Sequence, residues 1–243
     1  PEEIEKIRVS NIIVAEILNE LKGIVKPGIT TKELDLYSEA LARKRKAKPA
    51  FKGYNGYPFS LCASVNCVVV HGMPSERALV SGDILSMDFG VCCDGYYGDA
   101  AITVPIGQVS DEATRLMRCT EEALYHAIGE AVPGNRLGDI SAACQENVEA
   151  AGYSVVRDYV GHGIGRHLHE EPQVPNYGTK GRGLELKAGM VLAIEPMVNQ
   201  GTYRVKLLQD GWTVVTEDGR LSAHFEHTVA ITENGPDILS RLQ

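Results

Sequence analysis

The sequence has no long apolar run. A helix needs about 18 or more consecutive apolar residues to cross a bilayer, whereas residues 11–21 are interrupted by Glu16, Asn19 and Glu20. The first residues, Pro-Glu-Glu-Ile-Glu-Lys, also lack the features of a secretory leader. We therefore expect no membrane association and a cytoplasmic location.

Positive charge is scarce. The 243 residues include 24 Lys and Arg against 32 Asp and Glu, a formal net charge of -8. A nucleic-acid-binding face neutralises phosphates with clustered basic side chains, so we expect no DNA partner. The one basic run, residues 43–48, is typical of a solvated helix end, and contact with ribosomal RNA or an acidic protein is the alternative.

The chain also lacks paired cysteine motifs. Its six cysteines include no Cys-x-x-Cys spacing, which argues against a thiolate zinc site and a dense disulfide framework. Cys92 and Cys93 are adjacent in an expected strand, where neighbouring side chains point to opposite faces. We expect reduced thiols.

What the sequence does have is apolar periodicity in a chain that is 44% hydrophobic and long enough for a substantial core. Its first part predicts two helices and then three valine-rich strands, at residues 4–22, 31–42, 63–70, 84–91 and 96–104. Pro27-Gly28 separates the helices, and Thr30 or Thr31 is expected to cap the second.

This pattern recurs. A helix at 111–130 is followed by Pro133-Gly134 and another helix, 106 residues after Pro27-Gly28. The segment leading to Asp88 also resembles the segment leading to Glu195, at an offset of 107. Matched offsets indicate an internal duplication. We predict a single α+β domain over 1–243, with similar halves of about 1–107 and 108–243 sharing one sheet and an active site between them.

Two aspartates lie on a predicted hairpin whose turn is Asp94-Gly95. Counting outward from that turn places Gly90 opposite Asp99. Asp88 then shares a face with Asp99, with Cα atoms about 7 to 8 Å apart. This arrangement suits two carboxylates on one ion. The alternative is a pair of edge-strand aspartates facing water, and their apolar neighbours argue against it.

Three more polar residues occupy apolar, strand-like segments: His162, Glu195 and Glu226. Glu195 occupies the position of Asp88 in the repeat, and Pro196 ends its strand. His162 lies between glycines that permit close approach, although a single histidine there is usually a loop residue. Because carboxylates in apolar surroundings are costly unless paired or metal-bound, the five residues together predict a metal site.

Four carboxylates and one imidazole suit manganese, iron(II), cobalt or zinc, without thiolate ligands. Since carboxylates can bridge, five side chains match a pair of ions about 3.5 to 4 Å apart. Such a pair activates a bridging water and stabilises a tetrahedral oxyanion, which favours hydrolysis of a peptide or related amide.

Five motifs then resemble the type I methionine aminopeptidases, in this order: Met87-Asp88-Phe89-Gly90, Gly98-Asp99-Ala100-Ala101, Gly161-His162-Gly163-Ile164-Gly165, Ile194-Glu195-Pro196 and Glu226-His227-Thr228. The resemblance covers essentially the whole chain. It implies a duplicated pita-bread fold, whose pseudo-two-fold halves surround a central antiparallel sheet. It also implies two divalent ions, nickel included among the possible metals, held by Asp88, Asp99, His162, Glu195 and Glu226.

The implied activity is removal of the initiator methionine from nascent polypeptides when the second residue is small. Glu195 would relay a proton from water to the leaving amine, and His71 and His169 would contact the scissile peptide. The implied methionine pocket comprises Tyr54, Tyr57, Cys62, Leu168 and Trp212, and a weaker match places Na⁺ or K⁺ at Asn66, Val68 and Ser222. A monomer and contact with the ribosome are further expectations.

Without the resemblance, His71 and His169 would be interpreted as ordinary loop residues, and the aromatic residues as surface or core residues. For His126, His167, His224 and His227 we expect no role in catalysis or binding. Three residues depart from the family pattern: Leu168 stands where an aromatic residue is common, Ala100 where threonine is usual, and Cys67 where an acidic residue is common. None of them is a predicted metal ligand, so we expect altered affinity with activity retained.

Relatives with other functions differ from this sequence in particular features. Proline-specific relatives carry a large extra N-terminal domain. Type II enzymes carry a long insertion between the two glutamates, which are 31 residues apart here. A binding module that had lost catalysis would lack ligands, and all five are present.

Overall fold

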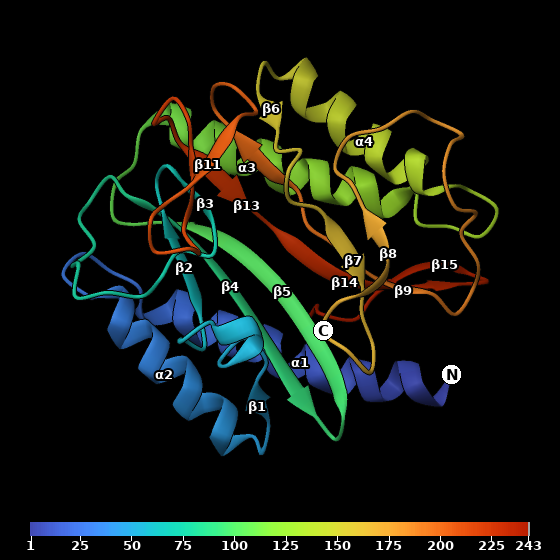
Figure 1. Cartoon of the computed structure of the whole chain (residues 1–243), viewed down its shortest axis with the longest axis horizontal. Coiled ribbons are helices and arrows are strands. Elements are labelled where there is room, and N and C mark those ends of the chain that lie inside the picture. The colour runs from blue at the N-terminus through green and yellow to red at the C-terminus, as the bar shows by residue number, and fades with distance from the viewer. Residues whose placement is uncertain (243) are drawn as a thin grey trace.

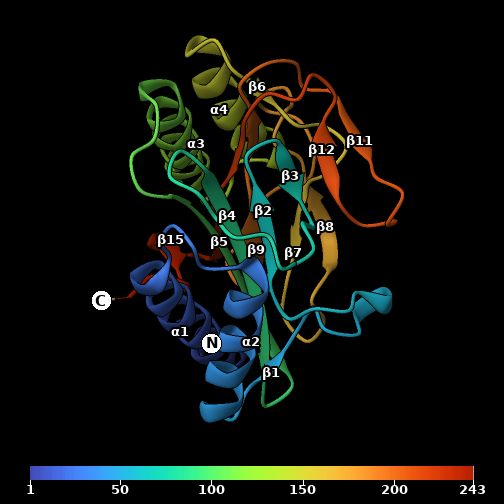
Figure 2. The same ribbon diagram turned by 90° about the vertical axis from the view of Figure 1, so that its left-hand side faces the viewer.

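The computed structural model describes residues 1–242. Four α-helices lie on one side of a curved sheet, and short strands and loops lie on the other (Figures 1 and 2). The helices are α1 (Glu2–Ile24), α2 (Thr31–Lys44), α3 (Asp111–Gly129) and α4 (Leu137–Ala150). Each matches a predicted helix, with ends that differ by a few residues.

Local chemistry sets the ends of α2. Thr30 is its N-cap, because its hydroxyl accepts a hydrogen bond from the Glu33 amide at 3.1 Å while the Glu33 carboxylate accepts one from the Thr30 amide at 2.8 Å. The helix ends inside the basic run, where Arg43 pairs with Glu39 and Arg45 pairs with Glu16. The expected helix end is therefore confirmed at residues 43–48.

The main sheet has nine strands within residues 1–242, and all of its strand pairs are antiparallel. Seven follow one another across it: β1 (Lys48–Pro49), β4 (Ile84–Cys93), β5 (Tyr96–Pro105), β14 (Glu226–Thr232), β9 (Val191–Ile194), β7 (Gly161–Gly163) and β8 (Glu170–Val174). Two more lie beside it: β2 (Cys62–Val65) pairs with β4 and β15 (Gly235–Ile238) with β14. The predicted central antiparallel sheet is confirmed.

Two three-stranded sheets complete the fold. One contains β13 (Ser222–His224), β10 (Met197–Asn199) and β6 (Ser154–Val155), and the other contains β11 (Val205–Leu207), β12 (Val214–Thr216) and β3 (Val68–Val70). A short 3₁₀ helix spans Tyr54–Gly56. These small sheets connect segments that are distant in sequence.

The β4–β5 hairpin has the predicted register. Gly90 pairs with Asp99, and Asp94 and Gly95 form the turn with φ values of 48° and 79°. Positive φ at both turn residues gives the strands the twist that a two-residue hairpin needs. Asp88 pairs with Ala101, two residues beyond the Gly90 pair, so Asp88 and Asp99 are diagonal neighbours.

One strand prediction was wrong in extent. Residues 63–70 form β2 and β3, because Asn66 adopts a φ of 56° and the chain turns there. The Asn66 side chain fixes this turn by accepting a hydrogen bond from the Ile84 amide at 3.0 Å. The strand that leads to Glu195 ends as predicted: Pro196 follows the end of β9, and the chain continues in another sheet as β10.

Two apolar cores flank the middle of the sheet. One consists of buried residues between positions 14 and 106, and the other draws nearly all of its residues from positions 113–231. Strand β14 lies between β5 and β9 and so joins strands from the two regions. All six cysteines are free, and no helix within residues 1–242 has the length and apolar content needed to cross a membrane.

Candidate metal centre

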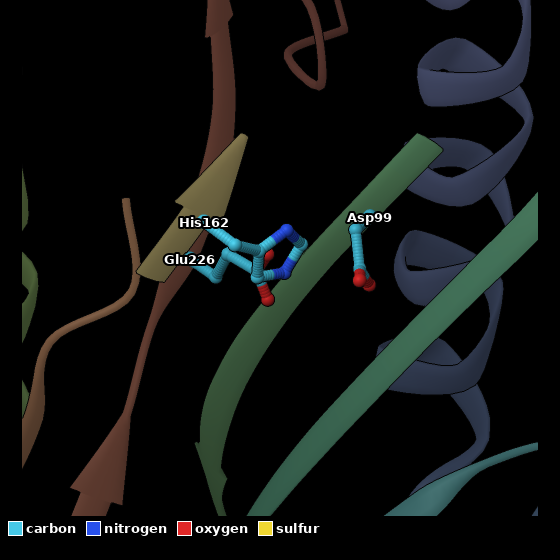
Figure 3. Close-up of side chains that lie close together, drawn as sticks. All are labelled: Asp99, His162 and Glu226. Carbon is cyan, nitrogen blue, oxygen red and sulfur yellow. The ribbon is translucent and has the colours of Figure 1, made fainter. Parts of the chain in front are cut away.

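The five predicted ligands come from five places in the main sheet and line one cavity of about 260 Å³. Asp88 is in β4, Asp99 in β5 and His162 in β7, while Glu195 follows β9 and Glu226 begins β14. Figure 3 shows Asp99, His162 and Glu226 pointing toward one another, and one donor atom from each lies within 4.8 Å of the others. Residues 138 positions apart in sequence thus meet at one point.

Glycines allow this close approach. A Cβ atom on Gly161 would lie 2.3 Å from the Ala193 carbonyl oxygen, and one on Gly163 would lie 2.4 Å from that of Glu171. Only glycine therefore lets β7 fit between β8 and β9 with His162 facing the cavity. In β4, a Cβ atom on Gly90 would lie 3.2 Å from an Asp99 carboxylate oxygen, so this glycine leaves room for the acid.

The carboxylates fit a cationic occupant. Asp88 Oδ1, Asp99 Oδ1 and Glu226 Oε1 are buried and have no hydrogen-bond partner among the described residues. Leaving a buried carboxylate oxygen without a partner is costly. Divalent metal ions would satisfy these oxygens, and oxygen donors with an imidazole are a set that such ions accept. The alternative of a water-facing edge aspartate is excluded for Asp99, which is only 3% exposed.

The pKa values of the four carboxyl groups also favour a positively charged occupant of this cavity. Burial raises the pKa of Asp88 to about 7. Burial, followed by repulsion from neighbouring carboxylates, raises the pKa values of Asp99, Glu195 and Glu226 well above their ordinary range. Bound cations reverse this balance by favouring the ionised carboxylates.

His162 is oriented as a neutral ligand. Its Nδ1 lies 2.9 Å from the carbonyl oxygen of Gly163, which can only accept, so Nδ1 carries the proton. Its Nε2 faces Glu195 Oε1 at 3.5 Å. Burial, and then the nearby His169, lower the pKa of His162 to about 4. The Nε2 lone pair is therefore free for a metal at neutral pH.

His71 and His169 line the same cavity. A hydrogen bond of 2.7 Å joins Nδ1 of His169 to the Tyr54 hydroxyl, and the His169 ring centroid lies 4.3 Å from that of His162. His71 has a φ of 56°, and burial followed by the proximity of His169 lowers its pKa to about 4. Both predicted peptide-contacting histidines thus lie beside the carboxylates.

The predicted methionine-pocket residues form one wall of the cavity: Tyr54, Tyr57, Cys62, Leu168 and Trp212. The Tyr57 and Trp212 rings meet edge to face, with centroids 5.1 Å apart. Burial raises the pKa of the Cys62 thiol well above its ordinary value, which keeps it uncharged. Leu168 is 2% exposed, so the residue that replaces an aromatic is packed into the wall and does not leave its rim open.

The residues of the predicted monovalent-cation site lie close together. The Ser222 amide donates to the Asn66 carbonyl at 2.9 Å, and Val68 pairs with Val215 in the small sheet. The Asn66 side chain is already engaged with Asp83 at 2.7 Å. The Asn66 and Ser222 contacts place these segments together without an ion, and the cation stays a prediction.

Sequence reasoning missed several residues of the cavity: Phe51, Asn55, Val70, Tyr159, Val160 and Met197. It also treated His224 as ordinary, which does not fit its position, because a donor atom of His224 lies within 4.8 Å of donors on Glu195 and Glu226. A signal was present, since His224 is two residues before Glu226 and alternate residues of an extended chain share a face. His227, in contrast, contacts Ser240 at 2.8 Å.

Comparisons with known proteins agree with this geometry. The model of metallopeptidase family M24 matches residues 5–233. The chain is 57% identical to a methionine aminopeptidase of Clostridium perfringens over 241 residues, covering 99% of this chain and 97% of that protein. It is 54% identical to methionine aminopeptidase 1 of Bacillus subtilis over 242 residues, covering 100% and 98%. The crystal structure of a Thermotoga maritima methionine aminopeptidase superposes with a TM-score of 0.98 at 50% identity, covering 100% and 98%.

Proposed function

The chain belongs to metallopeptidase family M24, and we propose that it is a metal-dependent aminopeptidase that removes the N-terminal methionine of polypeptides. One observation carries the proposal. Four carboxylates and an imidazole, with buried oxygens that lack partners, lie at one cavity with a wall of aromatic and sulfur-containing side chains. These features support a hydrolytic centre beside a pocket suited to a thioether.

The proposed metal ligands are Asp88, Asp99, His162, Glu195 and Glu226. Two divalent ions bound to them would supply the nucleophilic water and the Lewis acid that peptide hydrolysis requires. We propose that Glu195 accepts a proton from the attacking water and delivers it to the amine nitrogen as the peptide bond breaks. The position of its carboxylate between two imidazole nitrogens, at 3.5 and 3.6 Å, supports this role.

Two histidines are proposed to act on the peptide carbonyl. His169, held by the Tyr54 hydroxyl, and His71 line the cavity beside the carboxylates, where an imidazole N–H can orient the carbonyl and stabilise its oxyanion. Their lowered pKa values keep them neutral at pH 7, so each ring has one N–H to donate.

Specificity is proposed to come from the pocket. Tyr57, Cys62 and Trp212 present polarizable surface, which favours a methionine side chain over a charged one. We propose a small second residue in the substrate, as the family resemblance implies. The metal is proposed to be cobalt, manganese, iron(II), zinc or nickel, because mixed carboxylate and imidazole ligands accept all of them. We further propose that the enzyme acts as a monomer in the cytoplasm on nascent chains, with transient contact at the ribosome.

The test is methionine release from Met-Ala-Ser and Met-Leu-Ser by metal-stripped protein, before and after addition of manganese or cobalt. We expect metal-dependent cleavage of Met-Ala-Ser only. Glu195→Gln should lower kcat by about a hundredfold or more, while Glu185→Gln, on the exposed surface, should match the wild type. No cleavage with any metal would contradict the proposal and favour a peptide-binding role.

A further inference from the structure

A second imidazole reaches the carboxylates. His224 ends β13 and is 1% exposed, and its Nε2 has no hydrogen-bond partner among residues 1–242. This nitrogen lies 3.6 Å from Glu195 Oε2, on the opposite side of the carboxylate from His162. Donor atoms of Glu195, His224 and Glu226 all lie within 4.8 Å of one another. His224 thus completes a second cluster that shares Glu226 with the first.

The distances match shared coordination better than direct hydrogen bonding. The two imidazole nitrogens lie 3.5 and 3.6 Å from the two oxygens of Glu195, whereas a charge-assisted N–H···O bond is about 2.7 to 2.9 Å long. Two donors that each bind one ion at about 2.1 Å in a tetrahedral arrangement lie about 3.4 Å apart. Both separations are therefore those of ligands on a common ion.

The Thr103 hydroxyl holds the backbone of His224. The Thr103 hydroxyl donates to the His224 carbonyl at 2.7 Å and accepts from the His224 amide at 2.9 Å. Ser86 lies 2.8 Å from the same hydroxyl. Because the Thr103 proton is already used, Ser86 donates in that contact. Strands β4 and β5 thus hold β13 in place, which supplies the rigid support that a metal ligand needs.

We propose that His224 is a sixth protein ligand of the metal centre, so that each of two ions takes one imidazole. His162 would serve the ion on the side of Glu195 Oε1, and His224 the ion on the side of Glu195 Oε2. This inference rests on the dinuclear centre proposed above. It also implies a metal preference: an imidazole ligand favours zinc, cobalt, nickel or iron(II) over manganese at the His224 position.

The test counts ligands and does not rely on activity. Cobalt-loaded wild type, His224→Gln and the control His126→Gln, whose side chain is exposed on α3, are compared by calorimetry and X-ray absorption. We expect two imidazole nitrogens per pair of cobalt ions in the wild type and one in His224→Gln. The dissociation constant of the weaker cobalt should rise about ten- to a hundredfold in His224→Gln, and His126→Gln should be unchanged. His162→Gln is the reference for losing one imidazole.

Two results would overturn the inference. One is a single imidazole per two cobalt ions in the wild type, which requires no variant to fold. The other is a folded His224→Gln protein with wild-type affinity and ligand count. Protein that binds no cobalt at all would contradict the dinuclear centre as well, so that failure is distinguishable from the failure of His224 alone.

Discussion

Replacing Asp88 with asparagine is expected to stabilise the metal-free protein at neutral pH, even though it removes a proposed ligand. Burial raises the pKa of Asp88 to about 7 in the folded chain, against about 3.9 in an unfolded one. Between these values the folded state keeps a proton that the unfolded state has lost. The contribution of Asp88 to the stability of the metal-free protein therefore falls as the pH rises from about 4 to about 7.

The size of the effect follows from the two pKa values. A difference between about 7 and about 4, at about 1.4 kcal/mol for each pKa unit, amounts to about 4 kcal/mol at pH 7. Asparagine keeps the shape of aspartate and does not ionise, so Asp88→Asn should recover most of this free energy. At pH 4, where the folded wild type is already protonated at Asp88, the two proteins should be nearly equal.

The assay is urea unfolding of chelator-treated protein at pH 4, 5.5 and 7. Asp94→Asn, in the exposed turn of the same hairpin, is the matched control and should leave stability unchanged. With saturating metal the order should reverse, since a bound ion stabilises only the protein that retains its ligand. The reasoning fails if the stability difference between Asp88→Asn and wild type is the same at pH 4 and pH 7, or if Asp88→Asn is the less stable protein at pH 7.

Three further predictions concern the cavity. Gly163→Ala should destabilise the protein by about 1 to 3 kcal/mol and weaken metal binding, because the new methyl group would clash with the Glu171 carbonyl. Thermal unfolding measures this loss, and the control Gly129→Ala, whose methyl group would enter open space, should leave the stability unchanged. Tyr54→Phe should lower kcat about two- to tenfold with little change in KM, since it removes the hydroxyl bonded to His169; unaltered steady-state kinetics would exclude that orienting role. Leu168→Phe should lower KM for Met-Ala-Ser about two- to tenfold through contact of the thioether with an aromatic ring; equal kcat/KM in both proteins would remove Leu168 from the account of the pocket.

The hairpin was predictable because its chemistry is local. Asp94-Gly95 specifies a two-residue turn, and the turn then fixes every pair along β4 and β5, including Gly90 with Asp99. The helix caps follow in the same way from Thr30 and Glu33. The pita-bread fold was predicted from the family resemblance, and the comparisons confirm it.

What escaped prediction depends on contacts between distant segments. The run 63–70 has continuous strand composition, and its division into β2 and β3 reflects which sheet each part joins. His224 faces the carboxylates because β13 is held against β4 and β5 by Thr103. The local signal was its place two residues before Glu226, whereas His227 directly follows Glu226 and faces Ser240. The ligand assignments and the boundary between the halves stay predictions.

The short seam between β5 and β14 has a consequence for motion. Only two residue pairs, Glu226 with Ala101 and His227 with Ala100, join these strands, and a hydrogen bond from the Thr228 hydroxyl to the Asp99 carbonyl at 2.8 Å reinforces them. Metal ions bound by Asp99 in β5 and Glu226 in β14 would link the two strands through coordination bonds. Separation of the two strands would then require ligand release, so the rate of metal exchange becomes a measure of how often the seam opens.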